Sequence, residues 1–149
     1  MKVDATTKQI LGLLRKNARM PYKEIAGKIG KPESTVRDRI KKLEAAGIIK
    51  GYTAILDRNG LGLSCSAFVV AAVENDRVAD VTRALLEMPN VLQVHHTSGG
   101  KRLVFLVAAK DFEGLQAFLS NGLAKLRLKD EEVIVILKSF REYAAPLEF

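Results

Sequence analysis

The first fifty residues carry apolar side chains at the spacing of three consecutive amphipathic helices. The three apolar stripes consist of Val3, Ile10, Leu14 and Ala18; of Tyr22, Ile25, Ala26 and Ile29; and of Val36, Ile40 and Leu43. Asp4 and Thr6 are available as caps for the first helix. Gly30 is placed to close the second, and the third starts at Lys31 and Pro32 and ends at Gly47. We expect the three helices to close one small core.

Beyond residue 47 the pattern changes to short apolar runs separated by turn residues. Residues 48–56 read as a strand that leaves the helical region, and residues 57–62 read as a turn. Further strands are expected at 66–73, 91–97, 103–109 and 133–139, with helices at 77–88, capped by Asp76, and at 112–126. The order βαββαβ predicts a ferredoxin-like sandwich.

The two patterns predict an α+β chain of three parts. Residues 1–50 form a three-helix, winged-helix-like helix-turn-helix domain, residues 51–63 a linker strand and turn, and residues 64–149 the ferredoxin-like domain. Two helices cover only one face of a four-stranded sheet, yet the runs at 103–107 and 133–137 are apolar on both faces. This pattern calls for a second protein layer, and we expect a homodimer formed sheet to sheet.

Charge is divided unequally between the parts of the chain. Of the 24 Lys and Arg and 17 Asp and Glu, residues 1–52 hold 13 basic and 5 acidic side chains, while the remainder holds 11 and 12. Such asymmetry is typical of a protein in which an N-terminal DNA- or RNA-binding domain, here called the headpiece (residues 1–50), is joined to a second domain of nearly zero net charge. A solvated basic face without a partner would have the same composition.

The third helix has a polar face opposite its apolar stripe. The 100° step places Ser34, Asp38, Lys41 and Ala45 there, flanked by Thr35, Arg37, Arg39 and Lys42. Two short helices with a tight turn, the second carrying hydroxyls and cations, fit the major groove of double-stranded DNA. Arg37 suits guanine, Ser34 and Thr35 suit base edges or phosphates, and Asp38 either accepts from cytosine or orients Arg37. The expected backbone contacts are Arg39, Lys41, Lys42 and Lys50.

Several other classes of protein lack support in the sequence. There is one cysteine, Cys65, so no disulfide forms within the chain, and we expect a core residue in a reducing cytoplasm. No apolar run is long enough to cross a bilayer, and the first residues do not read as a signal peptide. No phosphate-binding glycine motif, metal-ligand spacing or nucleophile and base set is present, so we expect no catalytic residue, metal or cofactor.

The sequence closely resembles the leucine-responsive regulatory protein and asparagine-synthesis regulator (Lrp/AsnC) family of transcription factors. The resemblance rests on residues 4–14, 22–26, 34–44 and 47–52, and continues in weaker form through the rest of the chain. It implies a bacterial or archaeal regulator that forms dimers and often tetramers or octamers. Pro32 departs from the family, which usually has a capping Ser there, so the entry to the third helix is expected to lack that cap.

Residues 98–103, Ser-Gly-Gly-Lys-Arg-Leu, match the family's effector loop except at Arg102, where the family has Asp. The resemblance implies an effector site formed by His96, Thr97, Ser98, Gly99, Gly100, Lys101 and Arg102. Arg102 removes a partner for the α-ammonium of an amino acid and supplies one for a carboxylate or phosphate. Alternatively the loop is a plain hairpin turn whose glycines allow positive φ, and the regulator has no effector.

His95 and His96 end a predicted strand and should face opposite sides of the sheet, which is unfavourable for binding one metal ion together. His96 either lines the effector site or is an interface histidine. The sequence therefore predicts a sequence-specific transcriptional regulator, with an architectural DNA-wrapping protein of low specificity as the alternative.

Overall fold

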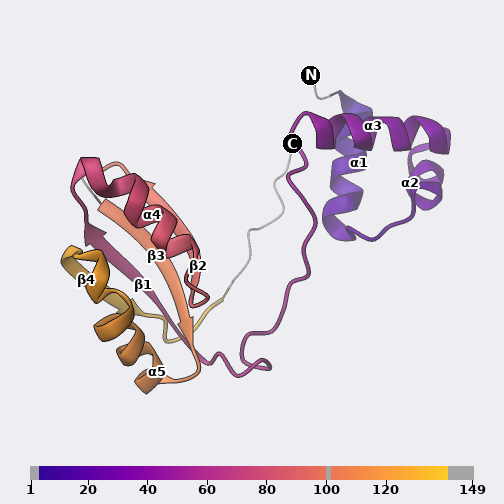
Figure 1. Cartoon of the computed structure of the whole chain (residues 1–149). Coiled ribbons are helices and arrows are strands. Elements are labelled where there is room, and N and C mark those ends of the chain that lie inside the picture. The colour runs from indigo at the N-terminus through magenta and orange to yellow at the C-terminus, as the bar shows by residue number, and fades with distance from the viewer. Residues whose placement is uncertain (1–3, 100–101, 141–149) are drawn as a thin grey trace. The chain divides into compact units, whose positions relative to one another are not determined.

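The computed structural model describes residues 4–99 and 102–140 and divides the chain into two compact units. The boundary lies between Ile55 and Leu56, inside the linker expected at 51–63. Figure 1 shows a helical unit and a unit built on a sheet. Each unit is described by itself below.

The helical unit consists of α1 (Ala5–Lys16), α2 (Tyr22–Ile29) and α3 (Glu33–Ala45), as predicted. Its buried core is formed by Ile10, Leu14, Ile25, Ala26, Val36 and Ile40. Asp4 rather than Thr6 caps α1, since Asp4 Oδ1 accepts a hydrogen bond from the Thr7 amide at 2.8 Å. The apolar stripe predicted for the first helix included Ala18, but α1 ends at Lys16 and Ala18 is exposed. Val3, the first residue of that stripe, lies outside the described residues.

The strand expected at 48–56 is not formed. Residues 50–57 are described without regular secondary structure, and residues 58–62 form the expected turn. A strand is defined by its ladder of hydrogen bonds to a second strand, and the described residues give this segment no such partner. Its apolar side chains are consequently open to solvent, with Ile55 66% and Leu56 56% exposed.

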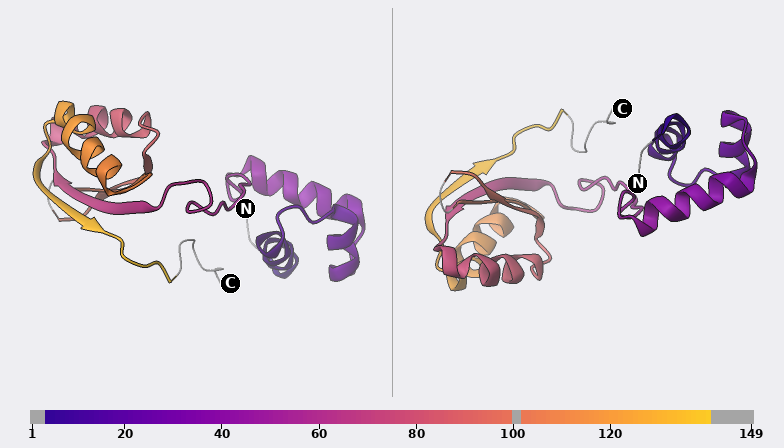
Figure 2. Two further views of the ribbon diagram at one scale, coloured as in Figure 1. Left: turned by 90° about the horizontal axis from the view of Figure 1, so that it is seen from below. Right: turned by 90° about the horizontal axis from the view of Figure 1, so that it is seen from above.

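The second unit is the predicted ferredoxin-like sandwich. Its elements are β1 (Cys65–Ala72), α4 (Val78–Leu86), β2 (Val91–Thr97), β3 (Arg102–Ala109), α5 (Phe112–Ala117) and β4 (Lys129–Val135). The strands form one antiparallel sheet in the order β2-β3-β1-β4. Figure 2 shows α4 and α5 on the same side of this sheet. The described helices include none that is long and apolar enough to cross a membrane.

Several element boundaries differ from the prediction. Asp76 does not cap α4, because it lies inside a 3-10 turn at Asn75–Arg77 that precedes the helix. The helix expected at 112–126 breaks after α5 into a π-helical turn, Phe118–Gly122, and a 3-10 turn, Ala124–Leu126. β4 begins four residues before the expected 133, because an edge strand accepts the polar residues 129–132 that apolar patterning excludes, and it ends at Val135 instead of the expected 139.

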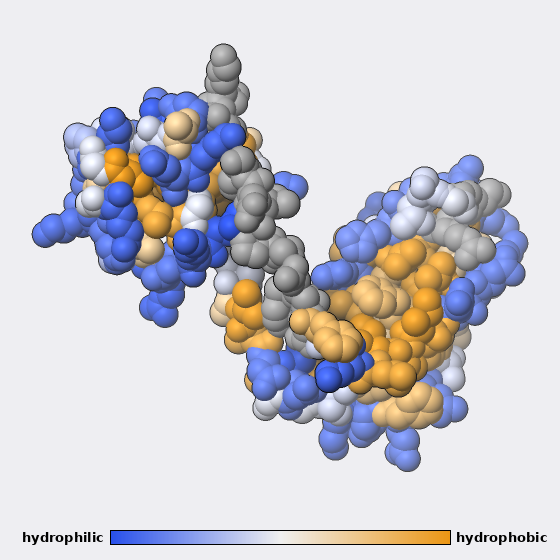
Figure 3. Space-filling model, turned by 180° about the vertical axis from the view of Figure 1, so that it is seen from behind, coloured by the Kyte–Doolittle hydropathy of each residue, from blue (hydrophilic) through white to orange (hydrophobic). Residues whose placement is uncertain are grey.

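One face of the sheet is packed against α4 and α5, and the other is open. Val69, Leu103 and Phe105 are fully buried on the packed side. On the open side, Phe68 and Ile134 lie opposite each other on β1 and β4 and are 38% and 47% exposed. Figure 3, the view from behind, shows hydrophobic side chains gathered on this unit. β3 and the last three residues of β4 are therefore apolar on both faces, as the sequence predicted.

Candidate nucleic-acid interface and ligand loop

A left-handed glycine forms the tight turn between α2 and α3. Gly30 has φ 64° and ψ 39°, and its amide donates to the carbonyl of Ala26, as does the amide of Lys31 at 3.1 Å. Glycine adopts this conformation without the strain that a side chain adds. Pro32 then starts α3 without a side-chain capping bond, which agrees with the missing serine. The two helices therefore form a helix-turn-helix.

The side chains of α3 that point outward are those on the side of the helix opposite its buried apolar stripe. Val36, Ile40 and Leu43 are fully buried, as the apolar stripe predicted. The opposite and flanking positions are exposed at Ser34, Arg37, Asp38, Lys41, Lys42 and Ala45. Lys50, beyond the end of α3, is exposed as well. α3 thus presents the hydroxyl of Ser34 and several cations on one accessible face, the combination suited to base edges and phosphates, whereas Thr35 is half-buried.

Arg37 is held by a carboxylate of its own helix. Its Nη2 donates to Glu33 Oε1 at 2.9 Å, an i,i+4 pair in which both side chains are about half exposed. The orienting partner is thus Glu33 and not Asp38, one of the two roles expected for Asp38. Sequence reasoning missed Glu33, although the i,i+4 spacing was the available signal.

Arg39 turns towards α1 instead of the outer face. Its Nη1 lies 2.7 Å from both carboxylate oxygens of Asp4 and 2.9 Å from Thr7 Oγ1. The hydrogen bond from Arg39, followed by those from Thr7, lowers the pKa of Asp4 to about 2. Arg39 therefore ties α3 to the beginning of α1, a contact between residues 35 apart that the sequence does not signal.

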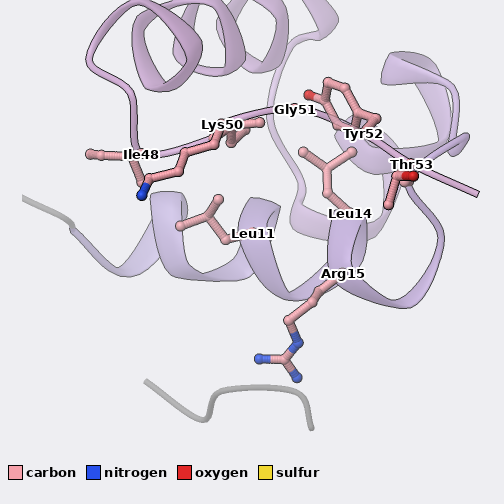
Figure 4. A pocket seen from close by; sticks show the side chains of 10 residues that line it. Leu11, Leu14, Arg15, Ile48, Lys50, Gly51, Tyr52 and Thr53 are labelled. Atoms are coloured by element: carbon pink, nitrogen blue, oxygen red, sulfur yellow. The ribbon is translucent and has the colours of Figure 1, made fainter. Parts of the chain in front are cut away.

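The segment that leaves α3 is anchored to the helical unit. Tyr52 donates from its hydroxyl to Glu44 Oε1 at 2.9 Å, and partial burial followed by this bond raises the pKa of Tyr52 to about 12. Figure 4 shows Leu11 and Leu14 of α1 pointing towards the segment, while Arg15 points away. Together they line a hollow of about 320 Å³ that extends along residues 48–53. The segment thus leaves α3 along a defined path.

The loop that the resemblance predicts to bind an effector, called the ligand loop below, joins β2 to β3. Thr97 pairs with Arg102 in the ladder, which places residues 98–101 in the connection. His96, Ser98 and Gly99 are exposed, and Thr97 is half-buried. Gly99 has φ 154°, a conformation that favours glycine. Gly100 and Lys101 lie outside the described residues, as does the side chain of Arg102.

The two histidines occupy opposite faces of the sheet, as predicted. His95 lies opposite Val104, and His96 lies opposite Leu103, which belongs to the buried core beneath the helices. Both imidazoles are exposed. His96 is therefore the one that precedes the loop on the helix-covered side.

Comparisons with known proteins assign each unit to a class. Residues 3–50 match the model of a winged helix-turn-helix DNA-binding domain, and residues 66–146 match that of the Lrp/AsnC ligand binding domain. The HTH-type transcriptional regulator FL11 of Pyrococcus horikoshii is 31% identical over 140 residues, which cover 94% of this chain and 93% of the relative.

Solved structures share the fold over nearly the full length. Bacillus subtilis LrpC is 26% identical with a TM-score of 0.85, covering 96% of this chain and 100% of its own. A Neisseria meningitidis transcriptional regulator in complex with L-Met has a TM-score of 0.85 at 23% identity, covering 95% and 94%. The latter identity supports similarity of fold alone.

The helix-turn-helix and the ligand-binding sandwich together define a DNA-binding transcriptional regulator. The chain belongs to the Lrp/AsnC family. These matches favour a regulator over an architectural DNA-wrapping protein.

Proposed function

We propose that this regulator acts as a dimer whose two α3 helices enter successive major grooves of a pseudo-palindromic site, about 34 Å apart. The observation that carries the proposal is the exposed outer face of α3, presented by the tight turn at Gly30. The proposed contacts are Ser34, Thr35, Arg37, Asp38, Lys41, Lys42 and Lys50. Arg39 was expected to contact the backbone, but its contacts with Asp4 and Thr7 support a positioning role.

The open face of the sheet supports the dimer. Two helices cover the opposite face, and exposed apolar residues such as Phe68 and Ile134 gain from burial against a second copy. Assembly into tetramers or octamers would bring more headpieces onto one DNA. The protein would act in the cytoplasm, where its DNA lies, by binding and without catalysis.

The test is fluorescence anisotropy of the full chain on DNA from upstream of its own gene and on a shuffled duplex, each titrated across salt concentration. We expect the upstream DNA to bind about a thousandfold more tightly or better, as specific sites do. Equal affinity for both duplexes, with a steep salt dependence, would instead support the architectural alternative.

We further propose that the loop at 98–102 binds a small effector bearing a carboxylate. Support comes from the ligand-binding domain match, from the similar fold of the regulator solved with L-Met, and from Arg102 in place of an acid. An arginine pairs with a carboxylate through two parallel hydrogen bonds, whereas an α-ammonium would be repelled. His96 and Thr97 flank the loop and would contribute polar contacts.

Thermal denaturation with L-methionine and with the matching 2-oxo acid, which lacks the ammonium group, tests this role. The wild-type chain should be stabilised more by the oxo acid, and Arg102→Asp should reverse the preference. If neither ligand shifts either protein and no other candidate carboxylate does, the plain hairpin turn is the better interpretation. DNA binding is measured separately, so failure here leaves the proposed DNA-binding mode intact.

A further inference from the structure

A basic hollow lies at one end of the sandwich. It is lined by Glu74, Arg77, Lys125, Arg127 and Lys129 and has a volume of about 540 Å³. Four cations thus meet a single carboxylate, although residues 53–149 as a whole carry one more acidic than basic side chain. Such a local excess within a neutral domain favours an anionic partner.

Internal contacts hold the walls of the hollow in place. Arg77 Nη2 donates to the carbonyl of Leu126 at 2.8 Å, which uses one of the five donors of its guanidinium. Lys129 Nζ lies 2.7 Å from Glu74 Oε1. The hydrogen bond to Glu74 raises the pKa of Lys129. Glu74 thereby offsets part of the positive charge of the hollow, and the charge of Asp130 also acts on Lys129.

The backbone around the hollow is strained. Arg127 and Asp130 are the two non-glycine residues of the described chain with positive φ, each at 49°. They flank Lys129, and the pairing of β1 with β4 changes register at the same point, between Val70 and Ala72. Left-handed conformations at residues with a side chain cost free energy and concentrate at functional sites. A glycine at 127 would remove the strain, yet the chain has an arginine there.

The hollow is separate from the ligand loop. Ala72, at the end of β1, pairs with Arg102 on one side and with Lys129 on the other. β1 therefore lies between β3, whose first residue closes the loop, and β4, whose first residue lines the hollow. The two places share one end of the sheet but not their residues.

We propose that this hollow is a second ligand site, which binds a small multiply charged anion bearing phosphate or carboxylate groups. Two guanidinium groups from different turns supply paired donors for such oxyanions, and the lysines add point charges. The concave shape and the volume suit a metabolite-sized molecule better than a DNA backbone, which tracks an extended basic surface.

Isothermal titration calorimetry of the full chain with inorganic pyrophosphate, at constant ionic strength, tests the site. Arg127→Gly removes the guanidinium while glycine adopts the left-handed conformation freely, so the fold should be kept or stabilised. Lys125→Ala removes a second wall cation. The matched control is Arg83→Ala, which removes an equal charge from an exposed i,i+3 pair with Asp80 on α4.

We expect the wild-type chain to bind one pyrophosphate per subunit, and the two hollow variants to bind about tenfold more weakly or worse, as loss of a charged hydrogen bond implies. Arg83→Ala should stay within about twofold, and Arg127→Gly should melt no lower than wild type. Citrate in place of pyrophosphate separates carboxylate from phosphate ligands; binding of either supports the site, and binding of neither overturns it.

Three results would refute the site. The first is equal weakening by all three variants, which indicates a general charge effect. The second is loss of pyrophosphate binding in the α3 variant Arg37→Ala while the two hollow variants bind pyrophosphate normally. The third is a uniform loss of DNA affinity in the hollow variants with pyrophosphate binding unchanged, which would assign the surface to nucleic acid.

Discussion

Two arginines of α3, only two positions apart, have different surroundings. Two helical steps rotate a side chain by about 200°, so Arg37 faces outward while Arg39 reaches back to α1. Arg37 is held by Glu33 in a half-exposed pair, and such pairs are worth about 0.3 to 0.5 kcal/mol. A guanine edge could displace this partner at little cost. The contacts of Arg39 with Asp4 and Thr7 link the helices themselves.

Arg37 and Lys41 should affect DNA binding differently. Arg37→Ala should cost about 1 to 3 kcal/mol on the specific site and relax sequence choice, because a bidentate base contact is lost. Lys41→Ala should weaken every sequence similarly and reduce the salt slope by about one unit, because a phosphate contact is lost. Anisotropy on specific and shuffled duplexes across salt measures both effects. Indistinguishable effects would contradict the assigned roles.

Asp4 should make the helical unit sensitive to acid. Its pKa is about 2 in the folded chain against 3.8 ordinarily, so the charged carboxylate stabilises the fold fully above about pH 4. This contribution is lost as the pH falls through about 2. Asp4→Asn keeps a capping oxygen but removes the charge facing Arg39. Its melting temperature should therefore fall below wild type at pH 5 and converge with it near pH 2.

Thermal unfolding followed by the circular dichroism signal of the helices, at pH values from 5 to 2, measures this difference in melting temperature. Asp38→Asn is the matched control, since it makes the same chemical change on the outer face of α3, away from Arg39. A gap between wild type and Asp4→Asn that stays constant from pH 5 to pH 2 would contradict the role of the ion pair.

At the scale of elements, the sequence was most informative where a helix carries its own signals. The 3.6-residue stripes and the glycines at 30 and 47 located α2 and α3, because helical hydrogen bonds and caps are local. The expected strand at 48–56 failed because a strand needs a partner that its own residues do not encode. β4 was placed too late because an edge strand does not need apolar residues.

The candidate site divides in the same way. The outer face of α3 followed from helical rotation, so Arg37, Lys41 and Lys42 were placed correctly on an exposed surface. The ties from Arg39 to Asp4 and from Tyr52 to Glu44 were missed. Both depend on tertiary packing that brings separate segments together, which periodicity alone does not report.

Two glycines of the helix-turn-helix should respond in opposite directions to the same added methyl group. A Cβ would meet nothing within 4 Å at either Gly27 or Gly30, so packing does not distinguish them. Gly27 lies inside α2, where alanine should stabilise by about 0.5 to 1 kcal/mol. Gly30 has φ 64°, where alanine should destabilise by about 1 kcal/mol or more. Urea denaturation of both variants gives the two signs, and matching signs would contradict the turn's assigned strain.

At the scale of the whole molecule, the two units differ in their charge and in the kind of surface that they expose. The excess positive charge lies in the helix-turn-helix part, where steering towards DNA requires it. The sandwich instead has an open apolar sheet face, which a monomer would leave in water. A dimer formed through that face would have two helix-turn-helix domains, one from each chain, to bind one DNA site. DNA affinity and self-association should therefore be coupled.

Phe68→Lys tests that coupling. Phe68 is on the open face and 38% exposed in the single chain, so lysine can reach solvent there without disrupting the packed core. In the proposed dimer the same ammonium would be buried without a partner, which strongly opposes association. The variant should be monomeric at micromolar concentration by sedimentation, whereas wild type should be a dimer or larger.

Phe112→Lys is the matched control, because Phe112 begins α5 and is 62% exposed outside the sheet. It should leave the mass and the DNA affinity unchanged. Phe68→Lys should bind the two-groove site no better than an isolated half-site, because each monomer engages one groove. If Phe68→Lys keeps the mass of wild type, or if wild type is itself a monomer, the open face is not the dimer interface. If the mass falls while DNA affinity is unchanged, the two headpieces bind independently of the sheet face.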